Sequence, residues 1–378
     1  MRRFIYTMII TVLFSSFIGV GLVSGEEKPI SIGLLVPITG TQAVMGEDLI
    51  TGANMALEEA NRAGGVLGRP LKLIIEDTET RPAPGMDAAR KLIGVDRVPV
   101  ITGGFSSGVS LPITKYAQDQ GVLYLLAVPT SPLFREVGSY CMSITVVDTF
   151  KGRAIAEFAV KDSGKKKFAL MFMNNAFGKM LMKATIENLE RLGAEVTTEV
   201  VYELNKVDYK AELQRLFAKN PEAIIGTWYA KEGLVTAKQA YEMGLLNVDK
   251  VPWYVPEVTT SFAEALQKEP TILEGIKGLD PLEPKKLFSD KFKKKVGREP
   301  VTAFAAQYYD AVRMIAMAIN FANSTDSAAI RDALFEIDDW YRGTSYGGDK
   351  RFDKDGMQDH ASFRKLIIKN GKKVNYIE

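Results

Sequence analysis

The stretch from Ile30 to Asp77 reads ISIGLLVPITGTQAVMGEDLITGANMALEEANRAGGVLGRPLKLIIED. Its first hydrophobic run, Ile30 to Val36, predicts a strand. A helical pattern follows, with apolar residues on one face at Leu49, Ala53, Ala56 and Ala60. Gly64 and Gly65 allow the left-handed turn that ends a helix, and Leu71 to Ile75 predicts a second strand. The order strand, helix, strand predicts a βαβ unit and therefore a parallel sheet.

The N-terminus carries the pattern of an export signal. Arg2 and Arg3 precede an apolar stretch from Phe4 to Val23, and small residues follow as far as Gly25. We expect residues 1–25 to be a cleaved signal peptide and the mature protein to be periplasmic. The apolar stretch is long for a signal peptide, so an uncleaved N-terminal anchor is the alternative. Since no cysteine follows the apolar run, we expect no lipid anchor.

Charge and length narrow the possible functions. The 378 residues include 48 basic and 46 acidic side chains, and loss of Arg2 and Arg3 would leave 46 of each. A neutral chain gives no electrostatic reason to expect nucleic acid or an anionic membrane as a partner. The chain is too long to fold around one compact core, so two domains are expected. The single cysteine, Cys141, lies in an apolar run and is expected to be a small core residue.

Beyond Asp77 the pattern of strand and helix continues and then restarts near Val146. Helices are expected over Pro82–Val95, Ser107–Asp119, Lys151–Lys161, Lys179–Leu192, Tyr209–Ala218, Lys231–Met243, Lys285–Val296, Ala303–Ala322 and Ser327–Ile337. Strands are expected over Val98–Thr102, Val122–Val128, Lys167–Met173, Glu195–Leu204, Ala223–Trp228 and Val251–Val255, with a C-terminal hairpin around Asn370-Gly371. Such alternation predicts an α/β protein with helices on both faces of doubly wound parallel sheets.

A serine hydrolase is one possible interpretation of the loop after Thr102. The residues from Gly104 to Gly108 match G-x-S-x-G between a strand and a helix, which would make Ser106 a nucleophile. The one histidine, His360, and an acidic turn with Asp353 and Asp355 would complete the set. A single histidine beside a turn is more simply a solvated residue, so we favour a protein without catalysis.

Metal and cofactor sites have little support in the sequence. One histidine and one cysteine cannot supply the ligands of a zinc site. The glycines between Gly64 and Gly68 close a helix, whereas a phosphate-binding loop opens one. We therefore expect no metal and no cofactor.

Polar and aromatic residues instead gather where the predicted strands end. In an open α/β sheet, ligands bind beyond the carboxyl ends of the strands. Ser106 and Ser107 would lie at a helix N-terminus, which favours a carboxylate, although helix capping is the simpler explanation of each serine taken alone. Glu257 could neutralise a ligand ammonium or be a solvated loop residue. The aromatic residues Phe177, Trp228, Tyr229 and Phe304 could line a pocket or belong to the core.

Several motifs together resemble the leucine/isoleucine/valine-binding proteins, which are type I periplasmic solute-binding proteins of ABC transporters. The resemblance covers essentially the whole mature chain. Its motifs are Ile32-Gly33-Leu34, Pro37-Ile38-Thr39-Gly40, Gly46, Gly52-Ala53, Ala63 to Arg69, Gly103 to Ser107, Thr130-Ser131-Pro132, Ala176-Phe177-Gly178, Pro256-Glu257 and Phe352 to Gly356. The resemblance implies two lobes joined by a three-stranded hinge: residues 26–147 with 279–357, and residues 148–278 with 358–378. It also implies closure over the ligand by hinge motion.

The resemblance further implies roles for single residues. Ser107 and the Thr130 backbone would take the ligand carboxylate, while the Val128 carbonyl, the Thr130 hydroxyl and Glu257 would take its ammonium. Phe177 and Tyr229 would close from the second lobe, and Phe304 would form another aromatic wall. Met45 stands where relatives often have an aromatic residue against the ligand side chain.

We therefore expect a monomer that binds a small, apolar amino acid and delivers it to a membrane permease. The alternative ligands are an amide, a urea or an aromatic carboxylate.

Overall fold

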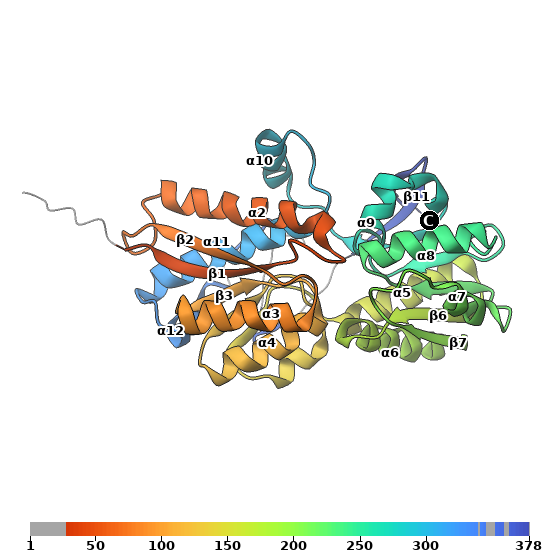
Figure 1. Ribbon diagram of the computed structural model, residues 1–378, viewed down its shortest axis with the longest axis horizontal. Coiled ribbons are helices and arrows are strands. Elements are labelled where there is room, and N and C mark those ends of the chain that lie inside the picture. Colours follow the sequence, from red (N-terminus) through yellow and green to blue (C-terminus); the bar gives the residue numbers. More distant parts are fainter. Residues whose placement is uncertain (1–27, 339–340, 345–351, 359–362, 378) are drawn as a thin grey trace, which may run out of the picture.

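The computed structural model describes residues 28–338, 341–344, 352–358 and 363–377. The chain forms two α/β lobes that lie side by side along the long axis of the molecule (Figure 1). This confirms the predicted fold class. The predicted signal peptide and His360 lie outside the described residues. Within the described residues, no helix is long and apolar enough to cross a membrane.

The first lobe is built on a five-stranded parallel sheet in the order β2-β1-β3-β4-β5. Its strands are β1 (Ile30–Val36), β2 (Leu71–Asp77), β3 (Val100–Gly103), β4 (Leu123–Leu126) and β5 (Cys141–Ser143). The predicted βαβ unit is confirmed, because β1 pairs with β2 in parallel and α2 (Ala43–Arg62) connects them. Gly64 and Gly65 have the positive φ angles, 102° and 81°, that the end of this helix requires.

Helices cover both faces of the first sheet because its strands alternate their side chains. Ile32, Leu34 and Val36 point to the face that is packed by α2, α10 (Lys286–Val296), α11 (Phe304–Ala322) and α12 (Ser327–Asp338). Leu35 and Ile101 point to the opposite face, under α3 (Pro82–Arg90), the π-helical turn η1 (Lys91–Val95) and α4 (Ser107–Asp119). Cys141 is buried in this second cluster, as predicted.

The second lobe has a seven-stranded sheet in the order β12-β11-β10-β9-β8-β6-β7. Its parallel strands are β6 (Lys167–Met173), β7 (Glu195–Tyr202), β8 (Ala223–Gly226), β9 (Trp253–Val255) and β10 (Lys277–Pro281). The predicted hairpin is confirmed as β11 (Phe363–Lys369) and β12 (Lys372–Asn375), which add to β10 in antiparallel pairing. Its helices are α5 (Asp148–Ser163), α6 (Ala176–Arg191), α7 (Lys210–Phe217), α8 (Ala230–Glu242) and α9 (Val258–Lys268).

Three of the strands and α-helices were not predicted from the sequence: β5, α9 and β10. Helices α5 and α6 each begin three residues earlier than expected. Helix α6 starts at Ala176 rather than Lys179 because the side chain of Asn175 accepts a hydrogen bond from the Gly178 N–H and so caps it. Helix α5 starts at Asp148 rather than Lys151, which places both residues in its first turn.

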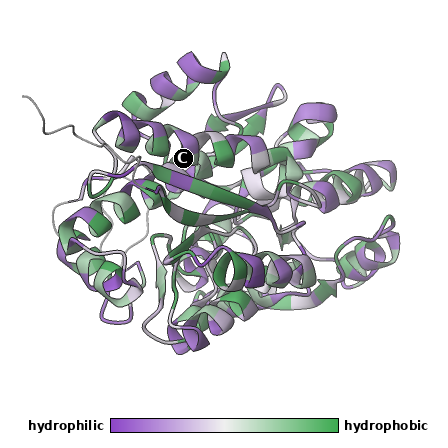
Figure 2. Ribbon diagram, turned by 60° about the vertical axis from the view of Figure 1, so that its left-hand side comes forward, coloured by the Kyte–Doolittle hydropathy of each residue, from purple (hydrophilic) through white to green (hydrophobic). Residues whose placement is uncertain are grey.

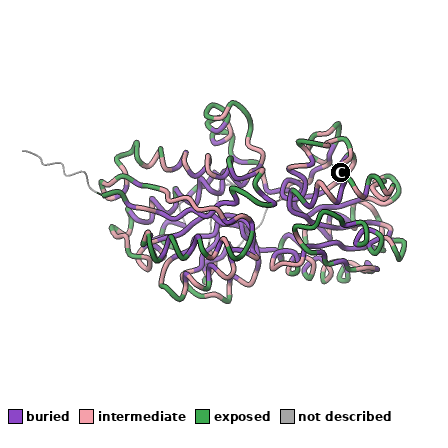
Figure 3. Tube along the Cα trace, in the orientation of Figure 1, coloured by how far each residue is buried: buried purple, intermediate pink, exposed green. Residues whose placement is uncertain are grey.

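The chain passes between the lobes from β5 to α5, from β10 to α10, and from α12 to β11. Hydrophobic residues concentrate in the central strands, while hydrophilic residues lie on the outer faces of the helices (Figure 2). Buried residues run through both sheets and continue where the lobes meet (Figure 3). The residue bounds of the two lobes stay a prediction.

Candidate ligand-binding site

Side chains at the starts of four helices meet where the lobes touch. Ser106, Asn175, Tyr229 and Glu257 each occupy the position before the first residue of α4, α6, α8 and α9. The first N–H groups of a helix have no partner within the helix, and the helix dipole is positive at that end. The interface therefore offers hydrogen-bond donors and a positive potential, which suit an anionic group.

A hydrogen bond between Tyr229 and Ser106 joins the two lobes. The Tyr229 hydroxyl donates to the Ser106 Oγ at 2.8 Å, and it accepts from the Asn175 Nδ2 at 3.2 Å. Burial raises the pKa of Tyr229, so this hydroxyl keeps its proton at neutral pH. Ser106 makes no side-chain capping hydrogen bond, which excludes the capping interpretation for this residue. It instead contacts the opposite lobe.

Ser107 organises the loop that follows β4. Its Oγ accepts hydrogen bonds from the backbone N–H groups of Thr130 and Ser131, both at 3.2 Å. Since the oxygen acts as the acceptor in both bonds, the hydroxyl proton can be donated to another group. The Thr130 carbonyl in turn accepts from the Asp148 N–H at 2.8 Å. Asp148 and the predicted site residues Ser107 and Thr130 are therefore held in one connected unit.

Three charged side chains are buried at the centre of this interface. The Lys151 Nζ lies 2.5 Å from the Glu257 Oε1 and 3.6 Å from the Asp148 Oδ1. The other Glu257 oxygen, Oε2, accepts a hydrogen bond from the Thr260 hydroxyl at 2.9 Å. Exposure of the Lys151 and Asp148 side chains is only 1% and 0%. We call Asp148, Lys151 and Glu257 the buried charge cluster.

The side chain of Glu257 is buried, which excludes the solvated-loop interpretation. Burial also shifts the pKa of Asp148. Removal from water raises the pKa of Asp148 to about 6, although the neighbouring Lys151 ammonium and the Thr130 hydroxyl lower it. The cluster has two carboxyl groups and one ammonium, so its net charge is negative when Asp148 is ionised.

An aromatic ring lies against the buried charge cluster, and the other predicted apolar residues belong to the core of the first lobe. Phe177 stacks on Tyr229 with ring centroids 6.3 Å apart, and the Lys151 ammonium lies 5.0 Å from the Phe177 centroid. On the first lobe, Phe304 packs edge to face on Phe105 at 5.6 Å. Met45 and Val128 belong to the same buried apolar group as these two rings.

Trp228 lies in the core and does not line the interface, because it stacks on Trp253 and Phe262. Gln42 lies between β1 and α2, directly before the first residue of α2. It is fully buried, and both of its side-chain polar atoms lack a hydrogen-bond partner among the described residues. The carbonyl of its neighbour Thr41 accepts from the Lys231 N–H across the lobes at 3.4 Å.

The structure brings most of the predicted site residues together. Contacts link Ser106 to Tyr229 and Tyr229 to Phe177. Others link Phe177 to Glu257 through Lys151, and Ser107 to Thr130. Asp148 and Lys151 were missed. A signal was present, since Lys151 lies four and seven residues before Ile155 and Phe158, on a helix face that is buried.

The residues of the hydrolase interpretation have other partners in the structure. The Ser106 Oγ accepts from Tyr229, and Asp353 and Asp355 lie 2.5 Å and 3.4 Å from the Arg135 guanidinium. Among the described residues, these contacts form a lobe interface and a partly exposed ion pair, and none of them joins Ser106 to either aspartate.

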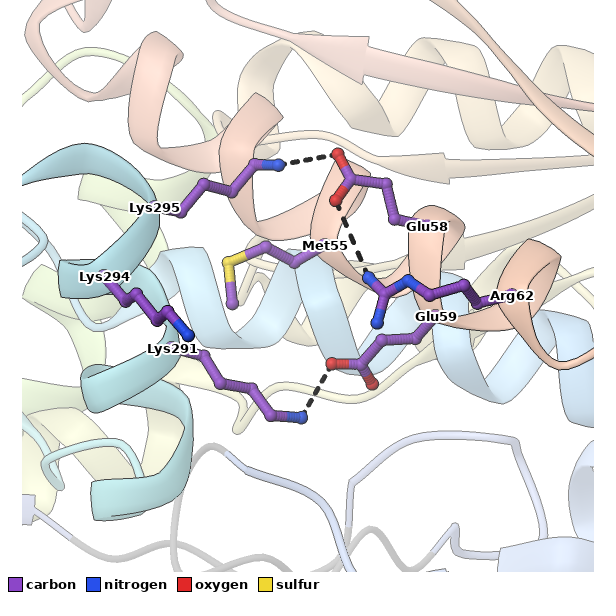
Figure 4. A pocket seen from close by; sticks show the side chains of 7 residues that line it. All are labelled: Met55, Glu58, Glu59, Arg62, Lys291, Lys294 and Lys295. Atoms are coloured by element: carbon purple, nitrogen blue, oxygen red, sulfur yellow. Dashed lines mark hydrogen bonds and ion pairs between the residues drawn. The ribbon is translucent and has the colours of Figure 1, made fainter.

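A separate pocket of about 490 Å³ lies between α2 and α10 on the first lobe (Figure 4). Its lining consists of Met55 and the charged residues Glu58, Glu59, Arg62, Lys291, Lys294 and Lys295. Lys291 pairs with Glu59 at 2.7 Å and Lys295 with Glu58 at 2.6 Å, so both carboxylates are already neutralised. This pocket contains none of the predicted site residues.

Comparison with known proteins places this architecture in a family. Residues 29–365 match the family described as periplasmic binding protein, and the chain therefore belongs to that family. Leu/Ile/Val-binding protein homolog 3 of Brucella melitensis is 26% identical over 343 residues, which cover 84% of this chain and 86% of the relative. Homolog 1 of Brucella abortus is 26% identical over 316 residues, with 81% and 82% coverage.

Solved structures show the same fold. A leucine-binding protein from Thermotoga maritima has a TM-score of 0.83 at 24% identity, covering 92% of this chain and 98% of its own. A solute-binding protein from R. palustris in complex with benzoate has a TM-score of 0.79 at 19% identity, with 92% and 95% coverage. At the level of the family, these are binding proteins rather than enzymes.

Proposed function

We propose that this chain is the periplasmic substrate-binding protein of an ABC transporter. It captures a small carboxylate with an apolar body between its lobes and delivers it to a membrane permease. The observation that carries this proposal is the lobe interface itself. There, Tyr229 of one lobe contacts Ser106 of the other, beside a buried charge cluster and a group of aromatic side chains.

The proposed binding mode assigns each part of the ligand to a part of the interface. The Ser107 hydroxyl and the free N–H groups at the start of α4 would bind the carboxylate. Met45, Val128 and Phe304 would contact the apolar body from the first lobe, and Phe177 and Tyr229 from the second. These residues are buried in the present arrangement, so entry would require the lobes to separate by hinge motion.

Two ligand classes fit this description. The sequence-based proposal is an apolar amino acid whose ammonium is bound by Glu257, and the names of the Leu/Ile/Val-binding relatives support it. Related folds in complex with isoleucine and with benzoate show that this architecture accommodates either an amino acid or an aromatic acid. The contact between Glu257 and Lys151 favours a ligand without an ammonium group, because Glu257 already has a cation beside it.

Cleavage after Gly25, a soluble monomer in the periplasm and delivery to a permease are parts of the same proposal. Mass spectrometry of protein recovered from the periplasm would show whether residues 1–25 are absent. Uptake of a labelled ligand should fall in cells that lack the protein and return when it is supplied.

Ligand capture is tested by a thermal-shift panel of amino acids, amides and small aromatic and aliphatic acids. A ligand at 100 times its Kd should stabilise the protein by about 2.7 kcal/mol. Mass spectrometry of small molecules released from the purified protein offers an independent readout. If no compound stabilises the protein and none is released from it, the proposed function is wrong.

A further inference from the structure

Lys151 places a positive charge inside the interface that is proposed to hold the ligand. Its side chain reaches from the first turn of α5 to the start of α9, where its ammonium lies 2.5 Å from the Glu257 Oε1. The side chain is 99% buried, and its ammonium faces the ring of Phe177 at 5.0 Å. A lysine so deeply buried is retained only with compensating partners, so its position in the fold is specific.

Both carboxylate oxygens of Glu257 therefore already have partners. One of its carboxylate oxygens faces Lys151, and the other accepts the Thr260 hydroxyl at 2.9 Å. A ligand ammonium brought to Glu257 would have to displace one of these partners or lie beside the Lys151 ammonium. Like charges at such short range repel strongly when both are removed from water.

A ligand carboxylate, in contrast, would be attracted to the Lys151 ammonium. An ammonium has three N–H donors, and the Asp148 Oδ1, at 3.6 Å from the Lys151 Nζ, lies beyond ordinary hydrogen-bond range. Lys151 can therefore donate to a further acceptor while it stays beside Glu257. Ser107, whose oxygen accepts two backbone N–H groups, has a hydroxyl proton to donate as well.

We propose that Lys151 determines ligand specificity by supplying, from within the chain, the positive charge that an amino acid would bring with it. The ligand class is then a carboxylic acid with an apolar body and no ammonium on the neighbouring carbon: a simple, 2-oxo, 2-hydroxy or aromatic acid. This inference rests on the proposed capture of a small carboxylate between the lobes.

The sharpest test uses pairs of compounds that differ only in the ammonium group. Suitable pairs are 4-methylpentanoate with L-leucine, and 3-phenylpropanoate with L-phenylalanine, measured by isothermal titration calorimetry at pH 5.5, where protonated Asp148 leaves the buried charge cluster without a net negative charge. In at least one pair, the acid should bind the wild-type protein about a hundredfold or more tighter than its amino acid. Equal or tighter binding of the amino acids would overturn the inference while leaving the proposed function intact.

Lys151→Gln removes the charge and keeps a long polar side chain. The acid should then bind about a hundredfold more weakly. The amino acid should gain affinity, because Glu257 becomes available to its ammonium. Lys183→Gln is the matched control, since this lysine is 71% exposed on α6 and its loss changes the net charge equally. Its affinities should equal those of the wild type.

The outcomes separate the two proposals. An unchanged acid affinity in a folded Lys151→Gln protein would overturn the role of Lys151. If that variant does not fold, the ratio within each pair for the wild-type protein decides alone. Absence of binding by every acid and every amino acid would overturn the proposed function together with this inference.

Discussion

The hydroxyl of Tyr229 donates a hydrogen bond to the hydroxyl of Ser106 across 2.8 Å, although 123 residues separate them in the chain. The two groups belong to different lobes, so the bond exists only when the lobes are in contact. The Asn175 Nδ2 donates to the same tyrosine oxygen, and the Asn175 Oδ1 accepts a hydrogen bond from the Gly178 N–H. Asn175, which belongs to the same lobe as Tyr229, therefore orients the tyrosine hydroxyl towards Ser106.

Tyr229→Phe removes this bond and keeps the ring that stacks on Phe177. We expect ligand affinity to fall by about 0.5–1.5 kcal/mol, the usual net contribution of one hydrogen bond, with little change in the stability of the unliganded protein. Calorimetry with the best ligand from the panel measures the first quantity and urea unfolding the second. An unchanged affinity would show that the bond does not contribute to the closed, liganded state.

Glu257→Gln leaves the buried Lys151 ammonium with a weaker partner. Breaking a buried ion pair by neutralising one member is expected to destabilise the protein by about 3–5 kcal/mol. The double variant Lys151→Met with Glu257→Gln should recover part of this loss, because no unpaired charge stays buried. The free energies of unfolding of the single and double variants, compared in a cycle, give the coupling. A double variant with the summed loss of the two single variants would contradict direct pairing.

Asp148 should make the stability of the protein depend on acid pH. Burial raises the pKa of this carboxyl from 3.8 to about 6, so the folded state favours its protonated form. The contribution of Asp148 to stability is therefore largest below pH 4 and is lost as the pH rises towards and above 6. The Asp148→Asn variant lacks this dependence. Its free energy of unfolding should therefore rise by about 3 kcal/mol relative to that of the wild type between pH 4 and pH 7. Urea unfolding midpoints of both proteins across this range would reveal a constant difference if the prediction is wrong.

The pH dependence of binding separates the two ligand classes. The charged groups near Asp148 are Lys151 on its own helix and Glu257 at the start of α9. A bound carboxylate would raise the pKa of Asp148 further, so an acid should bind more tightly as the pH falls from 7 to 5. An amino acid brings an ammonium together with its carboxylate, so its two effects on that pKa oppose each other and its affinity should change less over the same interval. Calorimetry in buffers of different ionisation enthalpy would also measure the proton taken up or released.

Gly52 permits a close approach of α2 to α11 in the first lobe. A Cβ at this position of α2 would lie 2.0 Å from the carbonyl oxygen of Ala305, in the first turn of α11. Gly52→Ala should therefore destabilise the protein by about 1–3 kcal/mol, because the two helices must move apart. Gly94→Ala is the control, since a Cβ at Gly94 meets no atom within 4 Å. Equal melting temperatures for both variants would argue against the close packing of α2 and α11.

The sequence predicted the alternating elements well, because their periodicity is local. The ranges Ser107–Asp119 and Lys167–Met173 agree with α4 and β6 to the residue. Helix α9 was missed because its start, Val258-Thr259-Thr260, has poor helix propensity and is kinked, with non-helical angles at Phe262. Strand β10 contains Gly278, Asp280 and Pro281, which are poor strand formers, and it is stabilised by pairing with β9 and β11.

The polar loops of the candidate site could be predicted from the sequence, but the burial of Lys151 beside Glu257 could not. Ser106, Ser107 and Thr130 follow strands, so their meeting at one edge follows from the fold class. The burial of Lys151 could not be predicted in this way, because a lysine within a helix is usually solvated. Its burial depends on Glu257, which is 106 positions away in the chain, and only the tertiary structure reveals that pairing.

The order of the elements has a consequence for how the protein folds. Helix α2 packs against α11, and the five parallel strands of the second lobe are made between them. The part of α2 that contacts α11 therefore stays uncovered until the chain reaches residue 304, and β11 and β12 complete the other sheet later still. Contacts of such large sequence separation slow folding. A chain synthesised from its N-terminus can complete neither lobe before its last quarter has emerged, so both lobes should become protease-resistant together, in one late step.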